Sequence, residues 1–169
     1  MRLSGLIPVC LLLAAAGCSR HDADSQSLSP ERSAAVESSV RNFVLSVAHD
    51  VSSEGPTAWQ KEFADDPAFF MAVEGQIAFP NRQAAARAIQ DLPRTIKHIE
   101  LRWGDDLRID PLTADLAVVA TSYTEVQTDP EGRQVTETGF FTGVVEFRGR
   151  RWQFRDAHWS VPVPRPKAQ

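Results

Sequence analysis

The chain of 169 residues has little cysteine and no excess of basic residues, and each absence narrows what the protein can do. Its two cysteines, Cys10 and Cys18, lie at the extreme N-terminus. The rest of the chain therefore offers no internal disulfide, no thiolate metal site and no cysteine nucleophile. Acidic residues outnumber basic ones by 22 to 18, so the basic stripe typical of nucleic-acid-binding domains is missing. We expect no nucleic-acid partner.

Sequence motifs for cofactors and metals are also missing. We find no glycine-rich phosphate loop, no paired-histidine zinc motif and no calcium-binding loop. The expectation is therefore no cofactor and no bound metal. With 43% hydrophobic and 24% charged residues, the composition is that of one globular domain that can bury a core without disulfides.

The first 17 residues are typical of a secretion signal peptide. Arg2 supplies a positive charge, and the apolar run that follows over residues 6–16 is too short to span a bilayer as a stable helix. The small residues directly before Cys18 resemble the lipobox of bacterial lipoproteins, with Ala15 where leucine is commonest. That resemblance implies that residues 1–17 are removed and that Cys18 becomes the lipidated first residue.

Two alternatives to lipidation stay open. Ordinary signal cleavage near Ala16 would leave a secreted protein with a free cysteine, and an uncleaved signal would act as an anchor. If Cys18 is lipidated, the Ser19 that follows it implies sorting to the outer membrane, as in enteric-type bacteria. The polar, serine-rich residues 18–29 then form a flexible tether. We expect a cell-envelope protein attached to the membrane through Cys18, with its domain in the periplasm.

The first half of the domain shows mainly helical patterns. Ser29 and Asn81 each precede apolar residues at helical spacing, and both residue types cap helices well. Gly55 and Pro56 break the chain between the first two helices, and Thr57 is expected to cap the second. The predicted elements are helices over 29–53, 57–63 and 82–92 and short strands over 68–73 and 76–79.

From residue 97 onward the pattern changes to the period of two that β-strands show. Ile99, Leu101 and Trp103 alternate with polar residues. The predicted strands cover 97–103, 107–109, 116–126, 139–147 and 150–161, with a bend at 104–106 and turns at 110–111, 129–132 and 148–149.

The closing hairpin, residues 139–161, is the most informative stretch of the sequence. With a two-residue turn, one face of the hairpin is aromatic yet carries an acid and an imidazole. Its two glycines leave room where side chains would normally fill, as in the wall of a pocket. The residues on this face are Gly139, Phe141, Gly143, Val145, Phe147, Trp152, Phe154, Asp156 and His158.

The loop at residues 129–132 decides which side of the preceding strand faces the core. Simple pairing across this loop places Leu116, Val118 and Ala120 on the Phe141 face. Ala117, Val119 and Tyr123 then point to the other side, although a bulge in the turn would reverse the assignment.

The order of these elements is that of an α+β domain, with helices before most of the sheet. In this order the chain resembles the nuclear transport factor 2-like superfamily, and within it the SnoaL-like branch, over residues 30–161. The most telling segments are residues 79–82 (Phe-Pro-Asn-Arg), 151–154 (Arg-Trp-Gln-Phe) and 158–160 (His-Trp-Ser). The resemblance implies a cone, in which N-terminal helices pack on a strongly curved, mostly antiparallel sheet around a cavity. Residues 162–169 follow as a proline-rich tail.

The resemblance leaves function open, because members include isomerases, dehydratases, polyketide cyclases, ligand-binding modules and non-catalytic assembly partners. Our first hypothesis is a non-catalytic domain that binds a small apolar ligand or an envelope partner. For any single aromatic residue, packing in the core is the plainer explanation. The residues expected to line a pocket are Trp59, Phe63, Phe70, Trp103, Phe141, Trp152 and Phe154.

Two other hypotheses follow from the sheet. In a SnoaL-like isomerase, cyclase or dehydratase, Asp156 and His158 would transfer a proton, since side chains two apart on a strand point the same way. Hydrogen bonding near the open end of the sheet is the plainer explanation for this pair. In an interaction module, the outer sheet face would form a homodimer or bind another protein. Its expected residues are Val119, Tyr123, Thr142 and Val144.

Overall fold

The first helix, α1, is defined by its two ends and by one apolar stripe. The computed structural model describes residues 28–162, in which α1 covers Pro30–Glu54. Ser29 caps it as predicted, because its Oγ accepts a hydrogen bond from the Arg32 amide at 3.3 Å. Gly55, with φ of 87°, ends it. The buried stripe consists of valines at helical spacing: Val36, Val40, Val44, Val47 and Val51.

The N-terminal predictions fall outside the described residues. The signal peptide (residues 1–17), the lipidation of Cys18 and nearly all of the tether therefore stay predictions, as does most of the tail after Pro162. Within residues 28–162, none of the helices combines the length and the apolar character that crossing a bilayer requires.

Short helical segments continue the first half of the domain. After α1 come a 3-10 helix, η1 (Pro56–Ala58), and a short helix, α2 (Trp59–Glu62). Thr57 lies inside η1 and caps nothing, so the predicted cap is wrong; the cap position belongs to Gly55. Asn81 caps α3 (Arg82–Asp91) as predicted, accepting from the Ala84 amide at 2.9 Å, and η2 (Leu92–Arg94) follows.

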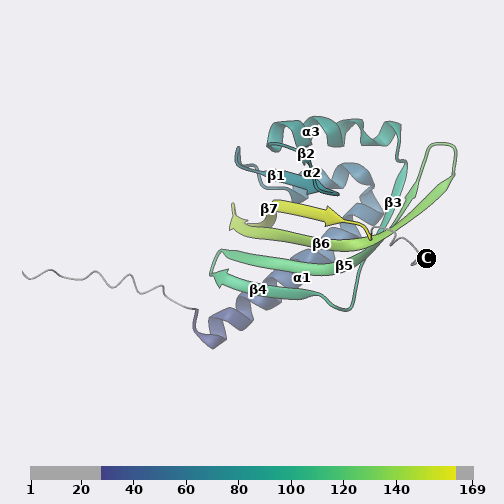
Figure 1. Cartoon of the computed structure of the whole chain (residues 1–169). Helices are drawn as coiled ribbons and strands as arrows, with labels where there is room; N and C mark the ends of the chain where they lie inside the picture. The colour runs from purple at the N-terminus through teal and green to yellow at the C-terminus, as the bar shows by residue number, and fades with distance from the viewer. Residues whose placement is uncertain (1–27, 163–169) are drawn as a thin grey trace, which may run out of the picture.

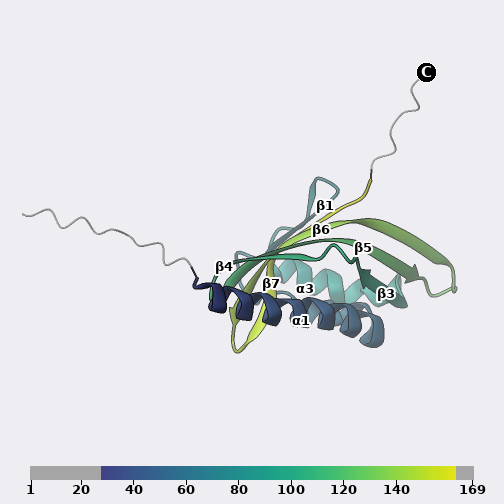
Figure 2. The same ribbon diagram turned by 90° about the horizontal axis from the view of Figure 1, so that it is seen from below.

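Seven strands form one curved sheet in the order β2-β1-β7-β6-β5-β3, with β4 beside β3 on the same edge of β5 (Figure 1). All pairs are antiparallel except β1 with β7. In Figure 2 the sheet arches over α1 and α3, which confirms the predicted α+β cone. The strands are β1 (Phe70–Val73), β2 (Gln76–Phe79), β3 (His98–Trp103), β4 (Arg108–Thr113), β5 (Leu116–Thr128), β6 (Gln134–Arg148) and β7 (Arg151–Ser160).

The predicted turn at Asp110 and Pro111 is wrong, because β4 runs through both residues. Pro111 pairs with Ala117 of β5. Its missing N–H is tolerated here because β4 is paired only with β5 among the described strands, so its other side is a sheet edge.

The loop between β5 and β6 is one residue longer than predicted. Thr128 pairs with Gln134, so the loop covers residues 129–133. The extra residue reverses which side of β5 faces inward, and the predicted assignment of Leu116, Val118 and Ala120 to the inner face is wrong. The buried residues on that face are Ala117, Val119, Thr121, Tyr123 and Glu125. Of the predicted outer interaction face, only Thr142 and Val144 point outward.

A β-bulge in the closing hairpin reverses which side chains of β7 face inward, compared with the prediction. The register of β6 against β7 shifts between Val144 and Val145, where β7 has one extra residue, Arg155. Side chains of β7 beyond this bulge alternate the other way. The buried residues there are Ala157 and Trp159, and the outward ones, which the sequence placed inside, are Asp156 and His158.

The space beside the two glycines of β6 is filled by neighbouring atoms. A Cβ on Gly139 would lie 2.1 Å from the Ser160 carbonyl oxygen and 2.8 Å from Tyr123 Cε1. A Cβ on Gly143 would lie 2.7 Å from Phe141 Cζ. Gly143 therefore opens no pocket, because it admits a core ring, whereas Gly139 admits the Tyr123 ring and also lines a depression at the end of β7.

Aromatic rings connect the helices to the sheet around Trp159 of β7. Its ring lies 5.7 Å from that of Trp59, edge to face, and 5.7 Å from that of Trp103, stacked. It also contacts Tyr123 and Phe141, each with ring centroids 4.7 Å apart. This cluster joins α2 to four strands of the sheet, β3, β5, β6 and β7.

Candidate functional site

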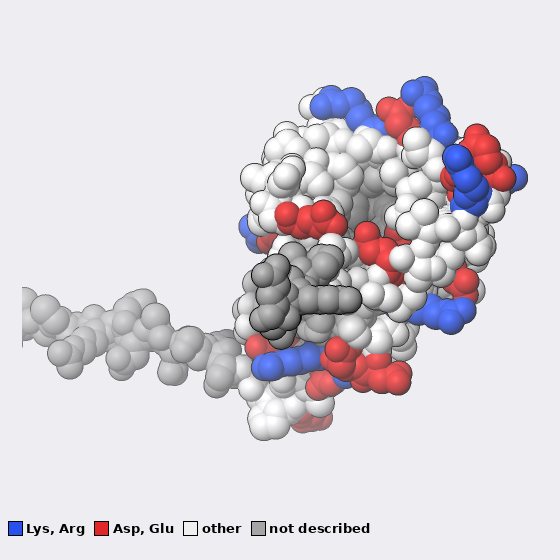
Figure 3. All heavy atoms as spheres, turned by 45° about the vertical axis from the view of Figure 1, so that its right-hand side comes forward, with Lys and Arg blue, Asp and Glu red and all other residues white. Residues whose placement is uncertain are grey.

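A largely apolar cavity of about 250 Å³ lies between α3, the β1–β2 hairpin and the inner face of the sheet. Figure 3 shows a hollow at the end of the molecule where β3 and the β5–β6 hairpin lie, with acidic side chains at its rim. The cavity walls come from elements far apart in the sequence. Apolar residues that line it include Trp59, Phe63, Phe79, Ile89, Ile99 and Trp159.

Of the seven aromatic residues predicted to line a pocket, only two lie in the lining of this cavity. Trp59 and Phe63 line the cavity. Phe141 and Phe154 are fully buried in the core, and Trp103 packs there while its Nε1 donates to the Val44 carbonyl oxygen at 2.7 Å. Trp152 lies near α1, where its Nε1 donates to Ser39 Oγ at 2.9 Å, and Phe70 is 42% exposed. Ligand binding by these residues stays a prediction.

One edge of the cavity is polar, and the sequence analysis did not identify it. Glu125 of β5 and Glu137 of β6 are direct cross-strand partners on the inner face. Gln127 Nε2 donates to Glu125 Oε1 at 2.6 Å, and the Tyr123 hydroxyl donates to Glu137 Oε1 at 2.6 Å. The sequence signal for this edge was the spacing of Tyr123, Glu125 and Gln127, which places their side chains on one face of the strand. That face was not predicted to point inward, because the predicted β5–β6 loop was one residue too short.

Burial controls the protonation of this polar edge. Glu125 is only 9% exposed, and burial raises its pKa above the ordinary value. The Gln127 hydrogen bond opposes this shift, and the nearby Glu137 charge adds to it. Burial and the bond to Glu137 also raise the pKa of Tyr123, so its hydroxyl remains a donor at neutral pH. Burial therefore favours the protonated form of Glu125 more than it would that of an exposed glutamate.

Asp156 and His158, the predicted proton-transfer pair, lie outside the cavity lining. They face outward on β7, where they pair with Phe70 and Ala72 of β1. His158 is exposed, and Asp156 is half-buried, with its pKa raised by burial. The sequence placed them inside because it did not show the bulge at Arg155. Their role in proton transfer stays a prediction, and the cavity contributes nothing to it.

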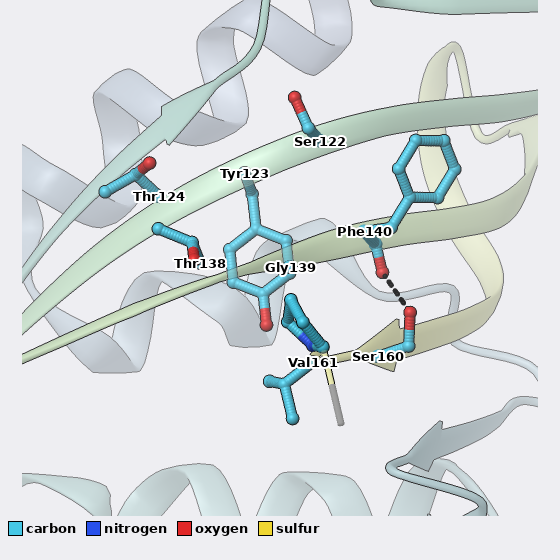
Figure 4. A pocket seen from close by; sticks show the side chains of 9 residues that line it. Ser122, Tyr123, Thr124, Thr138, Gly139, Phe140, Ser160 and Val161 are labelled. Carbon is cyan, nitrogen blue, oxygen red and sulfur yellow. Dashed lines mark hydrogen bonds between the residues drawn. The ribbon is translucent and has the colours of Figure 1, made fainter. Parts of the chain in front are cut away.

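A second depression, of about 480 Å³, lies where β5, β6 and the end of β7 meet (Figure 4). Hydroxyl groups line it, and Ser160 Oγ donates to the Phe140 carbonyl oxygen at 3.1 Å. In Figure 4 the Tyr123 ring lies beside Gly139 and points away from Ser122. Tyr123 lines this depression, and its hydroxyl bonds to Glu137, which lines the cavity.

Within residues 28–162, no three His, Cys, Asp or Glu side chains are grouped as a metal ion would require.

Solved structures share the fold. No family model matches the sequence, and no curated protein matches it. A nuclear transport factor 2-like superfamily protein from Salmonella enterica has a TM-score of 0.67 at 14% identity over 80% of this chain and 97% of its own. A candidate scytalone dehydratase from Novosphingobium aromaticivorans has a TM-score of 0.67 at 10% identity, over 79% of this chain and 88% of its own. A hexachlorocyclohexane dehydrochlorinase, LinA type 2, has a TM-score of 0.63 at 15% identity, over 83% of this chain and 94% of its own.

These similarities identify the architecture. The chain has the α+β cone fold of nuclear transport factor 2-like proteins, and its cavity lies inside the cone, between the helices and the sheet.

Proposed function

We propose that the protein is a cell-envelope lipoprotein whose cone binds a small, mostly apolar molecule. The observation that best supports ligand binding is the cavity of about 250 Å³, slightly below the roughly 300–1,000 Å³ typical of ligand pockets, as suits a small molecule. Aromatic and aliphatic side chains form most of its wall, and a few polar groups converge at one edge. Such a wall supplies affinity through apolar burial, while the polar edge fixes the orientation of the ligand.

Native mass spectrometry of the mature protein, extracted gently from its own membranes, tests the proposal. We expect a complex with a small molecule that denaturation releases. Val73→Phe, which fills the cavity, is expected to abolish the bound mass. The matched control Val118→Phe, on the outer face of β5, is expected to keep it. A bare protein mass in every preparation would show that the proposal is wrong.

A second candidate function, acid–base catalysis on an apolar substrate, is supported by Glu125. Its carboxyl group lines an apolar cavity and has a raised pKa, as general acids and bases often do. Fold neighbours named as a dehydratase and a dehydrochlorinase add weak support. Deuterium exchange from solvent into the extracted ligand is the test. Exchange that Glu125→Gln abolishes is the expected result, and exchange that persists in this variant would exclude Glu125 as the proton carrier.

A further inference from the structure

The polar edge of the cavity is rich in acceptors. Two carboxylates, Glu125 and Glu137, lie on adjacent strands, and the nearest donors, Gln127 and Tyr123, already bond to them. Among the described residues that line the cavity, none is Lys, Arg or His. No basic residue of the described cavity lining is therefore present to pair with these two carboxyl groups.

Glu125 is the residue of this edge that is most removed from water. Nine-tenths of its surface is buried, and Gln127 Nε2 occupies Oε1. The described hydrogen bonds give its second oxygen, Oε2, no protein donor, and this atom is not among the fully buried side-chain atoms that lack a partner, so it keeps contact with solvent. A ligand that brings an N–H or O–H donor can replace water at this oxygen. The cavity thus favours a ligand with N–H or O–H groups at this end.

The aromatic wall narrows the ligand class further. Trp59 and Trp159 line the same cavity, and Phe79 lies across it on β2. Indole and phenyl faces attract cations through their quadrupole, and desolvation strengthens this attraction. A carboxylate beside aromatic rings is the combination that recognises an ammonium group. An anionic ligand, in contrast, would be repelled by Glu125 and Glu137.

We propose that the cavity selects a small apolar amine in its cationic form, with the ammonium group at Glu125 and Glu137 and the apolar body against Trp59 and Trp159. This inference rests on the proposed binding function and names the class of ligand. A neutral alcohol of the same shape satisfies one acceptor but leaves the charge uncompensated, so it is expected to bind more weakly.

Three probes with a shared phenyl body test the selectivity of the full mature protein: 2-phenylethylamine, 2-phenylethanol and 3-phenylpropionate. Calorimetric titration at neutral pH is expected to give an affinity for the amine roughly tenfold or more above that for the alcohol, and no binding of the carboxylate. Equal affinity for amine and alcohol would overturn the amine inference and leave the proposed function intact. If none of the three probes binds, the amine inference is also overturned. The proposed binding function is tested separately, by native mass spectrometry.

Charge variants place the selectivity at the cavity edge. Glu125→Gln keeps the shape and removes the charge, and it is expected to erase the preference for the amine without weakening binding of the alcohol. Glu131→Gln removes the same charge from the exposed loop of the same hairpin and is expected to keep the preference. Glu137→Gln, at a more exposed position, gives a second test if Glu125→Gln fails to fold. Preference for the amine that survives both cavity variants would overturn the proposal.

Discussion

Glu62 shows how one buried carboxyl group ties the stability of the domain to pH. It is 5% exposed, and burial raises its pKa to about 7, opposed by the nearby Lys61. Between the ordinary glutamate pKa and about 7, the folded protein therefore holds a proton that the unfolded chain has lost. The stabilisation is complete below the unfolded pKa and is lost as pH rises through about 7.

The first prediction is that Glu62→Gln removes this pH dependence. At pH 8 the variant buries no charged carboxylate, so it is expected to be about 2 kcal/mol more stable than the wild type. This figure is smaller than the full pKa difference implies, because solvent screens part of the burial effect. At pH 4.5 the two proteins are expected to have nearly the same stability. Urea denaturation at both pH values measures the difference. Glu31→Gln, in the exposed first turn of α1, is the control. A wild type and a Glu62→Gln variant with the same dependence on pH would contradict the prediction.

The second prediction concerns Gly139, which lies against Tyr123. In Gly139→Ala the new methyl group meets the Ser160 carbonyl oxygen and the Tyr123 ring, so the strand and the ring must both move. We expect a loss of about 1–3 kcal/mol in the free energy of unfolding, together with loss of the Tyr123–Glu137 hydrogen bond. Thermal melts measure the first, and the ultraviolet spectrum of Tyr123, the single tyrosine, reports the second. Thr138→Ala, at the exposed neighbouring position, is expected to melt near the wild type.

At the scale of elements, the sequence predicted the starts of α1 and α3 far better than which side of a strand faces inward. Helix starts depend on local chemistry, so the caps at Ser29 and Asn81 could be predicted. Strand faces depend on register, which one residue reverses. Asp129 closes the β5–β6 loop by accepting from the Arg133 amide at 2.8 Å. No residue pattern distinguished this loop from a shorter one, so Tyr123, which belongs to the polar edge, was assigned outward.

The third prediction tests the register of β7 directly. Trp159→Ala is expected to cost about 3–5 kcal/mol, because it empties the centre of the aromatic cluster. His158→Ala, one residue away on the exposed side, is expected to change stability by less than about 0.5 kcal/mol. Chemical denaturation of both variants measures this contrast. Equal losses in the two would mean that the bulge at Arg155 is absent in solution.

At the scale of the whole molecule, the cone is one part of a longer proposed arrangement. The domain begins at Pro30, and the cysteine proposed to carry lipid lies twelve residues before it in the chain. A single acyl chain binds membranes weakly, whereas several chains on one residue anchor a protein stably. The proposed membrane attachment therefore depends on the acyl chains of Cys18.

The fourth prediction is that Cys18→Ser releases the protein from the membrane. The wild type is expected in the membrane fraction, with an intact mass above that of the chain from Cys18 by the mass of its acyl groups. The variant is expected either in the soluble periplasmic fraction or as the uncleaved precursor. Fractionation and intact-mass measurement distinguish these outcomes. An unmodified mature N-terminus on the wild type would show that the lipoprotein proposal is wrong.

The parallel pairing of β1 with β7 also has a consequence for the timing of folding. Phe70 pairs with Asp156, so a strand from the first half of the domain finds its neighbour only in the final strand. Contacts between such distant parts of a chain form slowly. During synthesis, β1 cannot pair with β7 until nearly the whole chain has been made. The cavity also lacks Trp159, one of its lining residues, until β7 has been made. The binding site is thus among the last parts of the protein to come into existence.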